Sequence, residues 1–434
     1  MAVSLRKVDF LIWSVFFLFV FSIPKSGTKV GAVPFYFGIL AVGLFIFMNL
    51  KFYKPIFLID LLPYWSIIGI VFTLLFYKNN IDLEIIIRYF VGFAVAPIVA
   101  NILYNKKVDL KSLTYLIFIT GLIPIIYGLF QLIFGMDRIA LSGVTVNAKQ
   151  LADYNYNFYK LMESKCNRVG EYYKLVSTYQ NGNLFGLFLV GFYPLLVSLE
   201  KTALKKFVYV IEVLTFVLIF RTLSRTAIFT FVIIFFVKLI WGIYIQKNIK
   251  VIDIMSKIFL LLVVSLLLNK ISKEGFFIPI FQRLFGASSE EVLTLNNRMV
   301  SDKLPSLGLR IIFGNPLYSH ESFYFVVIFS LGIIMGGIVL FTLLYIDYQI
   351  LLYRRKIFSN PLYFSYILAF VAFQIAGIAD LAWGLFPIET QFWIYFAISL
   401  VILKECEANL LPISLNKINI IEKLIIKRNL NSLR

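Results

Sequence analysis

Long apolar runs separated by short polar connections fill most of the chain. A helix that crosses the hydrocarbon core of a bilayer needs about 20 apolar residues. Five runs of roughly that length precede residue 136: 8–23, 31–50, 57–77, 83–104 and 113–135. Seven more follow: 183–199, 206–221, 226–246, 255–270, 322–346, 361–384 and 389–404. The pattern therefore predicts an all-α polytopic membrane protein with about 12 transmembrane helices.

Two long polar stretches interrupt the apolar runs, at 136–182 and 271–321. No internal repeat, low-complexity linker or soluble domain separates the runs, so we expect one membrane domain over 1–434. The C-terminal segment 405–434 predicts an amphipathic helix with a basic polar side, lying on the anionic inner leaflet. A plain topology anchor explains the same basic tail. The apolar face of the predicted amphipathic helix is formed by Leu415, Ile418, Ile421, Leu424 and Ile425.

Composition supports the membrane assignment. The chain is 60% hydrophobic and 15% charged, whereas a soluble domain is about 45–50% apolar and about 25% charged. The formal net charge of +18 suggests an anionic partner, but the basic residues are scattered between apolar runs. Nucleic-acid binding is therefore not expected. Cys166 and Cys406 fall on opposite sides of the predicted membrane, so no disulfide is expected.

The distribution of lysine and arginine predicts the orientation. Arg6 and Lys7 precede the first run, which lacks a small-residue cleavage site and is expected to be retained as a helix. With the N-terminus inside, cytoplasmic segments hold 22 of the 41 basic residues. The short outer connections hold only Lys25, Lys29, Lys78, Arg221 and Arg225. The positive-inside rule then places both termini in the cytoplasm and both long polar stretches outside, so most of the +18 reflects topology.

Several catalytic motifs are missing. There is no Gly-x-x-x-x-Gly-Lys-Ser/Thr phosphate loop, so ATP hydrolysis by this chain is not expected. The chain has one histidine, which excludes a multi-histidine metal centre. A carboxylate-only Mg²⁺ site stays open, although nothing in the sequence points to one. We expect no cofactor and no metal.

Polar residues gather at the predicted outer face. The first stretch carries Arg168 and ends in Gln180-Asn181-Gly182-Asn183, where the next run begins. Arg221 and Arg225 lie at the following outer connection and would share one helical face if a helix continued through them. Arginine at the edge of the hydrocarbon is costly unless it is paired or functional. The alternative for both is that they only reach back to the membrane surface.

The second stretch carries Arg283, Arg298 and Arg310 and ends in His320-Glu321. A lone histidine is more often a surface or satisfied residue. His320, however, lies where an outer loop re-enters the membrane, and its ordinary pKa near 6.5 suits proton transfer. Glu321 is equally explained as a favourable charge at a helix start. The intramembrane residues Arg88 and Glu212 could be paired and structural, and the sequence places neither on a pathway.

Several arginines with one histidine suit a particular chemistry. Guanidinium groups bind pyrophosphate oxygens in a bidentate manner and stay charged. They would stabilise a departing pyrophosphate, while a histidine could deprotonate a sugar hydroxyl. Glycosyl transfer from a lipid-linked donor at the outer face is the candidate reaction.

The order of these features resembles the O-antigen polymerase and O-antigen ligase superfamily. Asn183 and the following Leu184-Phe185-Gly186 resemble the family's Pro-Asn entry into a membrane helix, with Gly182 where proline is common. Thr222-Leu223-Ser224-Arg225 resembles its Thr-x-Ser-Arg element. The remaining matches are Asn297-Arg298, Ile311-Ile312-Phe313-Gly314, His320-Glu321-Ser322 and Leu331-Gly332-Ile333-Ile334-Met335-Gly336. Together the motifs cover roughly residues 165–340, and the first five runs match only in hydropathy.

The resemblance implies a membrane glycosyltransferase with a GT-C-like fold in the bacterial cytoplasmic membrane, using undecaprenyl-pyrophosphate-linked oligosaccharide and no nucleotide sugar. It implies that Arg225 and Arg298 hold the donor pyrophosphate and that His320 acts on the acceptor hydroxyl. Electrostatic candidates without a firm counterpart are Arg168, Arg221 and Arg310; the weaker substrate-binding candidates are Asn183 and Glu321. A chain-length regulator protein is a partner that the resemblance leaves open.

Besides a polymerase, three functions remain: a ligase, a polysaccharide flippase and a membrane scaffold. Within the family, we favour a polymerase, which joins repeat units, over a ligase, which moves finished glycan to lipid A-core. The departures from the family's His-Asn-Tyr and Pro-Asn forms lean that way. A polysaccharide flippase fits the length and the number of runs, but flippases are built from two similar halves with midplane sites. Here no such similarity is evident and the ionisable residues gather in outer loops. A scaffold would leave the arginine and histidine grouping unexplained.

Overall fold

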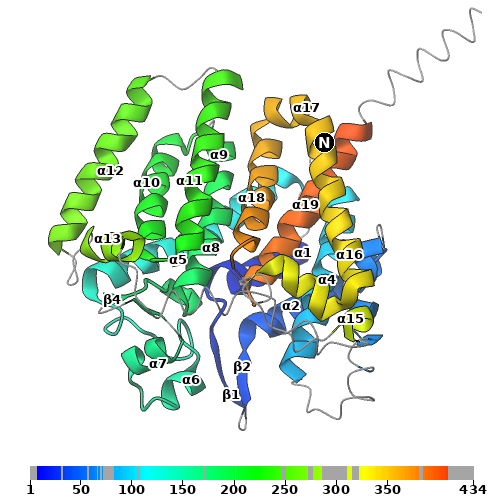
Figure 1. Cartoon of the computed structure of the whole chain (residues 1–434), viewed down its shortest axis with the longest axis horizontal. Coiled ribbons are helices and arrows are strands. Elements are labelled where there is room, and N and C mark those ends of the chain that lie inside the picture. The colour runs from blue at the N-terminus through cyan, green and yellow to red at the C-terminus, as the bar shows by residue number, and fades with distance from the viewer. Residues whose placement is uncertain are drawn as a thin grey trace, which may run out of the picture.

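The structure is a computed structural model of the whole chain. It describes residues 7–30, 33–55, 58–65, 67–68, 71, 83–105, 108–165, 167–169, 172–200, 202–245, 251–271, 277–285, 310–314, 322–380 and 385–408. The described part is mostly helical, as the sequence predicts, and its long helices stand roughly side by side (Figure 1).

The elements follow the apolar pattern closely. Up to residue 199 they are α1 (Lys7–Phe17), the π-helix η1 (Leu18–Ser22), β1 (Gly27–Val30), β2 (Val33–Tyr36), α2 (Phe37–Asn49), η2 (Leu50–Phe52), η3 (Leu58–Leu61), α4 (Leu83–Tyr104), α5 (Leu110–Phe134), α6 (Ala148–Ala152), α7 (Phe158–Ser164), β3 (Arg168–Val169), β4 (Tyr172–Tyr173), η4 (Ser177–Tyr179), α8 (Gly182–Phe192), η5 (Tyr193–Leu195) and α9 (Leu196–Leu199). Beyond it they are α10 (Lys205–Arg221), α11 (Arg225–Ile240), the π-helix η6 (Trp241–Ile245), α12 (Val251–Ile271), α13 (Phe277–Phe285), α15 (Arg310–Phe313), α16 (Phe323–Leu352), α17 (Arg354–Ser359), α18 (Pro361–Gly377) and α19 (Ile388–Ala408).

The described residues include helices that could cross a membrane. Four are long and apolar enough to cross a bilayer: Leu110–Phe134, Gly182–Leu199, Arg225–Ile245 and Phe323–Leu352. Shorter apolar helices lie at Asp9–Ser22, Phe37–Phe52, Phe93–Tyr104, Phe259–Ile271 and Pro361–Gly377. The helical character of the predicted runs is thus confirmed, whereas the number of crossings stays a prediction. Most of the third run and nearly all of the predicted amphipathic tail lie outside the described residues.

Hydrogen bonds join different elements at both ends of the helical bundle. At one end, Trp241 donates to the carbonyl of Phe358 and Lys356 donates to that of Cys406, both at 2.8 Å. At the other end, Thr178 donates to the carbonyl of Ser22 at 2.6 Å and Ser322 to that of Gly377 at 3.4 Å. The first set joins the end of α11 and the end of α19 to the α17 region, and the second joins the starts of α8 and α16 to the ends of η1 and α18.

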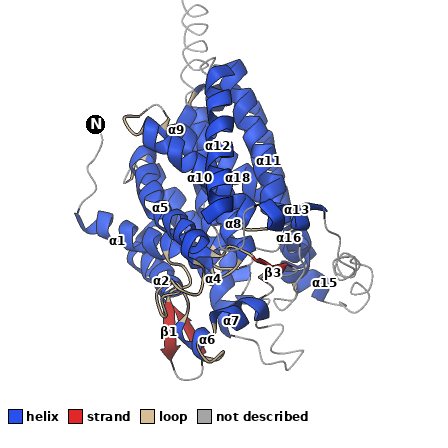
Figure 2. Ribbon diagram, turned by 90° about the vertical axis from the view of Figure 1, so that its left-hand side faces the viewer, coloured by secondary structure: helices blue, strands red, loops and turns tan. Residues whose placement is uncertain are grey.

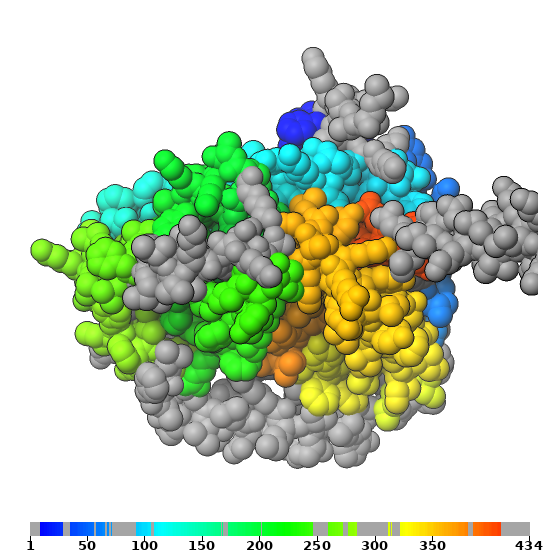
Figure 3. All heavy atoms as spheres, turned by 90° about the horizontal axis from the view of Figure 1, so that it is seen from above, coloured from blue at the N-terminus to red at the C-terminus, as the bar shows by residue number. Residues whose placement is uncertain are grey.

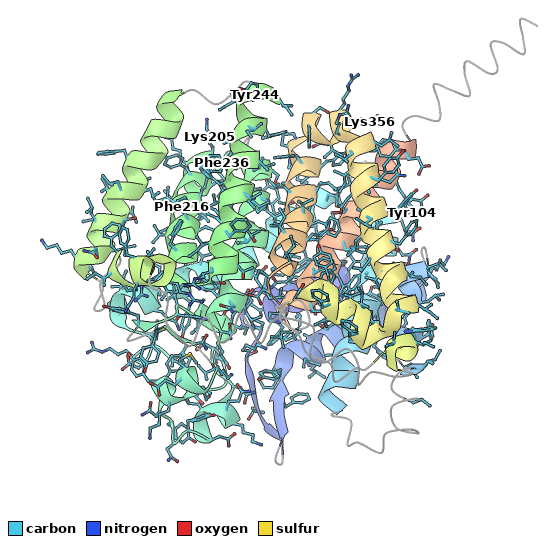
Figure 4. All side chains as sticks on the ribbon, viewed as in Figure 1. Tyr104, Lys205, Phe216, Phe236, Tyr244 and Lys356 are labelled. Carbon is cyan, nitrogen blue, oxygen red and sulfur yellow. The ribbon has the colours of Figure 1, made fainter. Side chains whose placement is uncertain are left out.

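We call these the α17 end and the loop end. Figure 4 places the labelled side chains Lys205, Tyr244 and Lys356 toward the α17 end. Elements β1, β2, α6 and α7 lie at the loop end in both Figure 1 and Figure 2. Seen from the α17 end, α10–α12 and α16–α18 form two neighbouring groups (Figure 3), which α11 and α18 join by direct contact.

A β-hairpin replaces the start of the second predicted span. Strands β1 and β2 pair antiparallel, with Gly27 opposite Tyr36 and Val30 opposite Val33, and helix α2 begins only at Phe37. The prediction of a helix from residue 31 is therefore wrong. Valine, threonine and aromatic residues favour strands as well as apolar helices, and Pro34 is tolerated because a two-stranded hairpin has only edge strands.

The polar stretch 136–182 is a folded unit rather than an open loop. It contains α6, α7, the β3–β4 pair and η4, arranged around a small apolar core of its own. That core is formed by Met136, Val146, Leu151, Phe158, Leu161, Met162 and Val176. Because this unit contacts the hairpin through α6, it covers the loop end of the bundle at a defined position.

Helix α16 is broken inside the tenth predicted span. Gly332 adopts φ 80° and ψ 162°, a backbone conformation for which glycine is strongly preferred. Gly314, at φ 84°, approaches the same place so closely that a Cβ on it would lie 2.6 Å from the backbone nitrogen of Gly332. At the break, the carbonyl of Leu331 accepts a hydrogen bond from the indole of Trp65 at 2.8 Å. Two glycine motifs far apart in the sequence therefore meet backbone to backbone.

A buried charge cluster joins α9, α10 and α11. The ammonium of Lys238 forms ion pairs with Glu200 at 2.7 Å and with Glu212 at 2.8 Å. The hydroxyl of Tyr193 donates to Glu212 at 2.9 Å. The pairing that the sequence left open for Glu212 is present, and the partner is Lys238. Arg88 has no described side chain.

Candidate functional site

The turn between α10 and α11 carries the predicted arginines. Helix α10 ends at Arg221, and α11 begins at Arg225 after a turn in which Leu223 has φ 52°. The side chain of Ser224 caps α11 by accepting from the backbone N–H of Ala227 at 3.3 Å. The helix does not continue from Arg221 to Arg225, because the left-handed residue and the cap interrupt it, so the condition for a shared helical face is not met.

Arg221 faces the folded polar stretch 136–182. It is 4% exposed, and its guanidinium donates to the carbonyl of Tyr173 at 3.3 Å. Its own carbonyl accepts from the backbone N–H of Leu175 at 3.2 Å. These contacts fasten the exit of the stretch to the end of α10. A role of Arg221 in binding pyrophosphate remains a prediction.

Arg225 is exposed, and it and Arg283 of α13 each donate to a backbone carbonyl in the segment that carries the other. The Nε of Arg225 donates to the carbonyl of Arg283 at 3.1 Å, and the Nε of Arg283 donates to the carbonyl of Leu223 at 3.0 Å. Each arginine therefore orients the segment that carries the other. The two guanidiniums reach the same turn from helices 58 residues apart, and the positive end of the α11 dipole lies at this turn.

Helix α13 holds Arg283 at the boundary of the apolar bundle. On α13, Ile278 is 63% and Phe281 60% exposed, whereas Ile280 is 8% exposed. The helix lies across the base of α12 (Figure 1) and contacts α10. A short helix with exposed apolar residues and a half-buried arginine is typical of an element lying in a membrane interface.

The start of α8 packs against the same turn. Asn181 caps α8 by accepting from the backbone N–H of Asn183 at 2.8 Å, and the side chain of Asn183 accepts from the ammonium of Lys174 at 3.3 Å. Gly182 departs from the proline common in the resembled family for a visible reason. A Cβ there would lie 2.6 Å from the Cβ of Lys174 and 2.9 Å from the carbonyl of Thr222. The Cβ of a proline at this position would make the same close contacts.

The remaining predicted residues divide into two groups. Arg168 begins β3 and Arg310 begins α15, but their side chains are not among those described. Arg298, His320 and Glu321 lie outside the described residues. The structure therefore brings together Arg221, Arg225 and Asn183.

The residue that sequence reasoning did not choose is Arg283. It was visible as one of the arginines of the second stretch, and in the surrounding Phe277–Phe285 sequence the polar residues Gln282 and Arg283 stand together among apolar ones, as on an amphipathic helix. Its pairing with Arg225 depends on a contact between distant segments, for which the sequence carries no local signal.

Comparison with known proteins found no matching family model, no matching curated protein and no matching solved structure. The geometry of this site and the resemblance of its motifs are therefore what support a function for the chain.

Proposed function

We propose that this protein is a polysaccharide polymerase of the O-antigen or capsule type. It joins undecaprenyl-pyrophosphate-linked repeat units by glycosyl transfer at the outer face of the bacterial cytoplasmic membrane. In this proposal both termini are cytoplasmic, and the loop end of the bundle faces outward. The basic residues Lys205 and Lys356 at the α17 end agree with that orientation (Figure 4).

The main support for the proposal is the arrangement of Arg225 and Arg283, each of which donates to a backbone carbonyl in the other's segment. Two guanidiniums at the loop end of apolar helices, beside an interfacial helix, suit a ligand with a pyrophosphate head and a hydrocarbon tail. Each Nε is engaged by a backbone carbonyl, which orients the guanidiniums before a ligand arrives. Such preorganisation lowers the cost of binding.

The surrounding contacts explain how the pair is held. Arg221 and the Leu175 N–H lock the folded stretch 136–182 onto α10. Gly186 of α8 allows close packing on α11, because a Cβ there would lie 2.6 Å from the Cβ of Ala227. The turn that carries Arg225 is therefore supported from three sides by α8, α13 and the polar stretch.

The reaction would proceed by displacement at the anomeric carbon of the donor sugar. The bond from that carbon to the pyrophosphate oxygen breaks, and a bond to the acceptor hydroxyl oxygen forms. The leaving group departs as polyprenyl pyrophosphate, and Arg225 and Arg283 stabilise the charge that develops on it. The resemblance to the O-antigen polymerase and ligase superfamily implies that Arg298 also binds the pyrophosphate and that His320 takes the proton of the acceptor hydroxyl.

Surface glycan from a deletion strain tests this function. A polymerase predicts that single capped repeat units replace the long chains in the deletion strain. Long lipid-linked polymer that never reaches lipid A-core would instead indicate a ligase, and repeat units trapped on the inner face would indicate a flippase. Complementation with the wild-type chain must restore the original pattern for any of these outcomes to count.

A further inference from the structure

A second group of cations lies in the folded stretch 136–182. Lys165 follows α7, and its ammonium donates to the side-chain oxygens of Gln150 at 2.6 Å and Gln180 at 3.0 Å. Both partners are neutral amides. Within the described part of the chain, no carboxylate forms an ion pair with Lys165. Its charge is therefore solvated by dipoles alone.

Lys25 belongs to the same network. Its ammonium donates to the carbonyl of Phe386 at 2.6 Å and lies 5.0 Å from the ring centroid of Tyr36. The hydroxyl of Tyr36 accepts from the amide of Gln150 at 2.5 Å, and the amide of Gln180 donates to the carbonyl of Lys25 at 3.2 Å. Gln180 thus links the ammonium of Lys165 to the backbone of Lys25, and Gln150 links it to Tyr36, whose ring lies beside the ammonium of Lys25.

Two described carboxylates of the same stretch accept hydrogen bonds from tyrosines. Asp137 accepts from the hydroxyl of Tyr159 at 2.9 Å, and Glu163 accepts from that of Tyr173 at 2.7 Å. Lys165 is only half-buried, so a ligand can reach it. Burial nevertheless lowers the pKa of Lys165 to about 8, because desolvation disfavours the charged form. An oxyanion beside the ammonium would offset that penalty.

The network is tied directly to the arginine turn. The side chain of Asn167 donates to the carbonyl of Gln180 at 3.0 Å and accepts from the backbone N–H of Gly182 at 2.9 Å. Gln180 therefore stands two residues before the helix that packs on the turn of Arg225.

We infer that the ammonium of Lys165, held by Gln150 and Gln180 in the network that also contains Lys25, is the centre of a binding site for an oxyanion of the lipid-linked substrate. The inference rests on the proposed function and extends it to the chemistry of the substrate. The oxyanion is either the carboxylate of an acidic sugar or the pyrophosphate of the second lipid-linked unit. Ammonium groups bind both as strong charge-assisted partners.

Thermal unfolding of the purified full-length protein with two probes tests the site. Sodium pyrophosphate and sodium glucuronate are titrated separately at constant ionic strength, and the rise in melting temperature gives the affinity. Because the arginine pair should also bind pyrophosphate, the titrations are repeated in a variant carrying R225A and R283A. The matched control is K160Q, which changes an exposed lysine of the same stretch.

We expect at least one probe to stabilise the R225A and R283A variant, with affinity about tenfold lower once K165Q is added, as expected for loss of a charged hydrogen bond. Stabilisation by pyrophosphate identifies the second lipid-linked unit as the source, and stabilisation by glucuronate alone identifies an acidic sugar. K160Q should leave the affinity unchanged. If K165Q impairs folding, K165R, which keeps the charge, should fold and bind.

Two results would overturn the inference: neither probe stabilises the R225A and R283A variant, or K165Q leaves the affinity equal to that of K160Q. The proposed function fails by a different result, namely long surface glycan in cells that carry R225A and R283A. The two failures are therefore distinguishable.

Discussion

Replacing Lys238 by methionine should destabilise the bundle more than any other lysine substitution in α10 or α11. Lys238 is 5% exposed and forms ion pairs with two carboxylates, of which Glu212 is itself 6% exposed. Methionine keeps the length and apolar contacts of the side chain, so the substitution removes charge with little change of volume. Without Lys238, Glu212 would remain buried and keep the hydrogen bond from the hydroxyl of Tyr193, but it would lose its ion pair with Lys238.

The magnitude follows from the distances. At an effective dielectric constant of about 20, two unit charges about 2.8 Å apart attract by about 6 kcal/mol. Desolvation of the three charged groups offsets much of the attraction in the two pairs. Removing one partner of a buried ion pair nevertheless costs about 3–5 kcal/mol, because the other partner is left uncompensated. We therefore expect K238M to lower the free energy of unfolding by about 3–5 kcal/mol.

Unfolding in mixed micelles, followed by tryptophan fluorescence, measures this loss. Trp241 is a local reporter, since it lies one turn from Lys238 and bonds to the carbonyl of Phe358. The matched control is K206M, which changes an exposed lysine of α10 and should alter stability by less than about 0.5 kcal/mol. Adding E212Q to K238M should recover part of the loss. The reasoning is refuted if K238M and K206M unfold alike.

Three further predictions concern local geometry and pH. Gly332→Ala should cost about 1–3 kcal/mol, because its backbone conformation is nearly exclusive to glycine, while Gly337→Ala, with nothing within 4 Å of the added Cβ, should be neutral or stabilising in the same unfolding assay. Asn181→Ala should cost about 1 kcal/mol through loss of the α8 cap, and an unchanged unfolding midpoint would contradict this. Anion affinity at the Lys165 network should fall as the pH rises through about 8, because the ammonium is the form that binds. In K165R, which stays charged, the affinity should not change over this range; the neighbouring titratable groups are Lys25 and Tyr36. An identical pH profile in both proteins would argue against the site.

The helices were predictable because apolarity and length are local properties of the chain. The run 83–104 coincides with α4, and 206–221 differs from α10 by one residue. Interruptions were not predictable in the same way. Gly332 stands among apolar residues that would continue a helix, and the break there is supported by the Ile312–Gly314 backbone. The connection between the runs 206–221 and 226–246 was predicted, but the left-handed backbone of Leu223, whose carbonyl accepts from Arg283, was not.

The candidate site was predictable only in part. Arg225 was recognised from a short motif at a helix end, and the structure places it at an exposed helix start. Its pairing with Arg283 arises only when α13 folds back onto the α10–α11 turn. The network around Lys165 was likewise hidden, because its members Lys25, Gln150 and Gln180 come from three separate segments.

Polymerisation by the purified protein tests the central claim most directly. The protein is given a lipid-linked repeat unit, and product chain length is read on a gel for R225A, R283A and the control K160Q. The account predicts long chains from the wild type and K160Q, and loss of chain extension in both arginine variants although they remain folded. Long chains of normal length from folded R225A and folded R283A would contradict it.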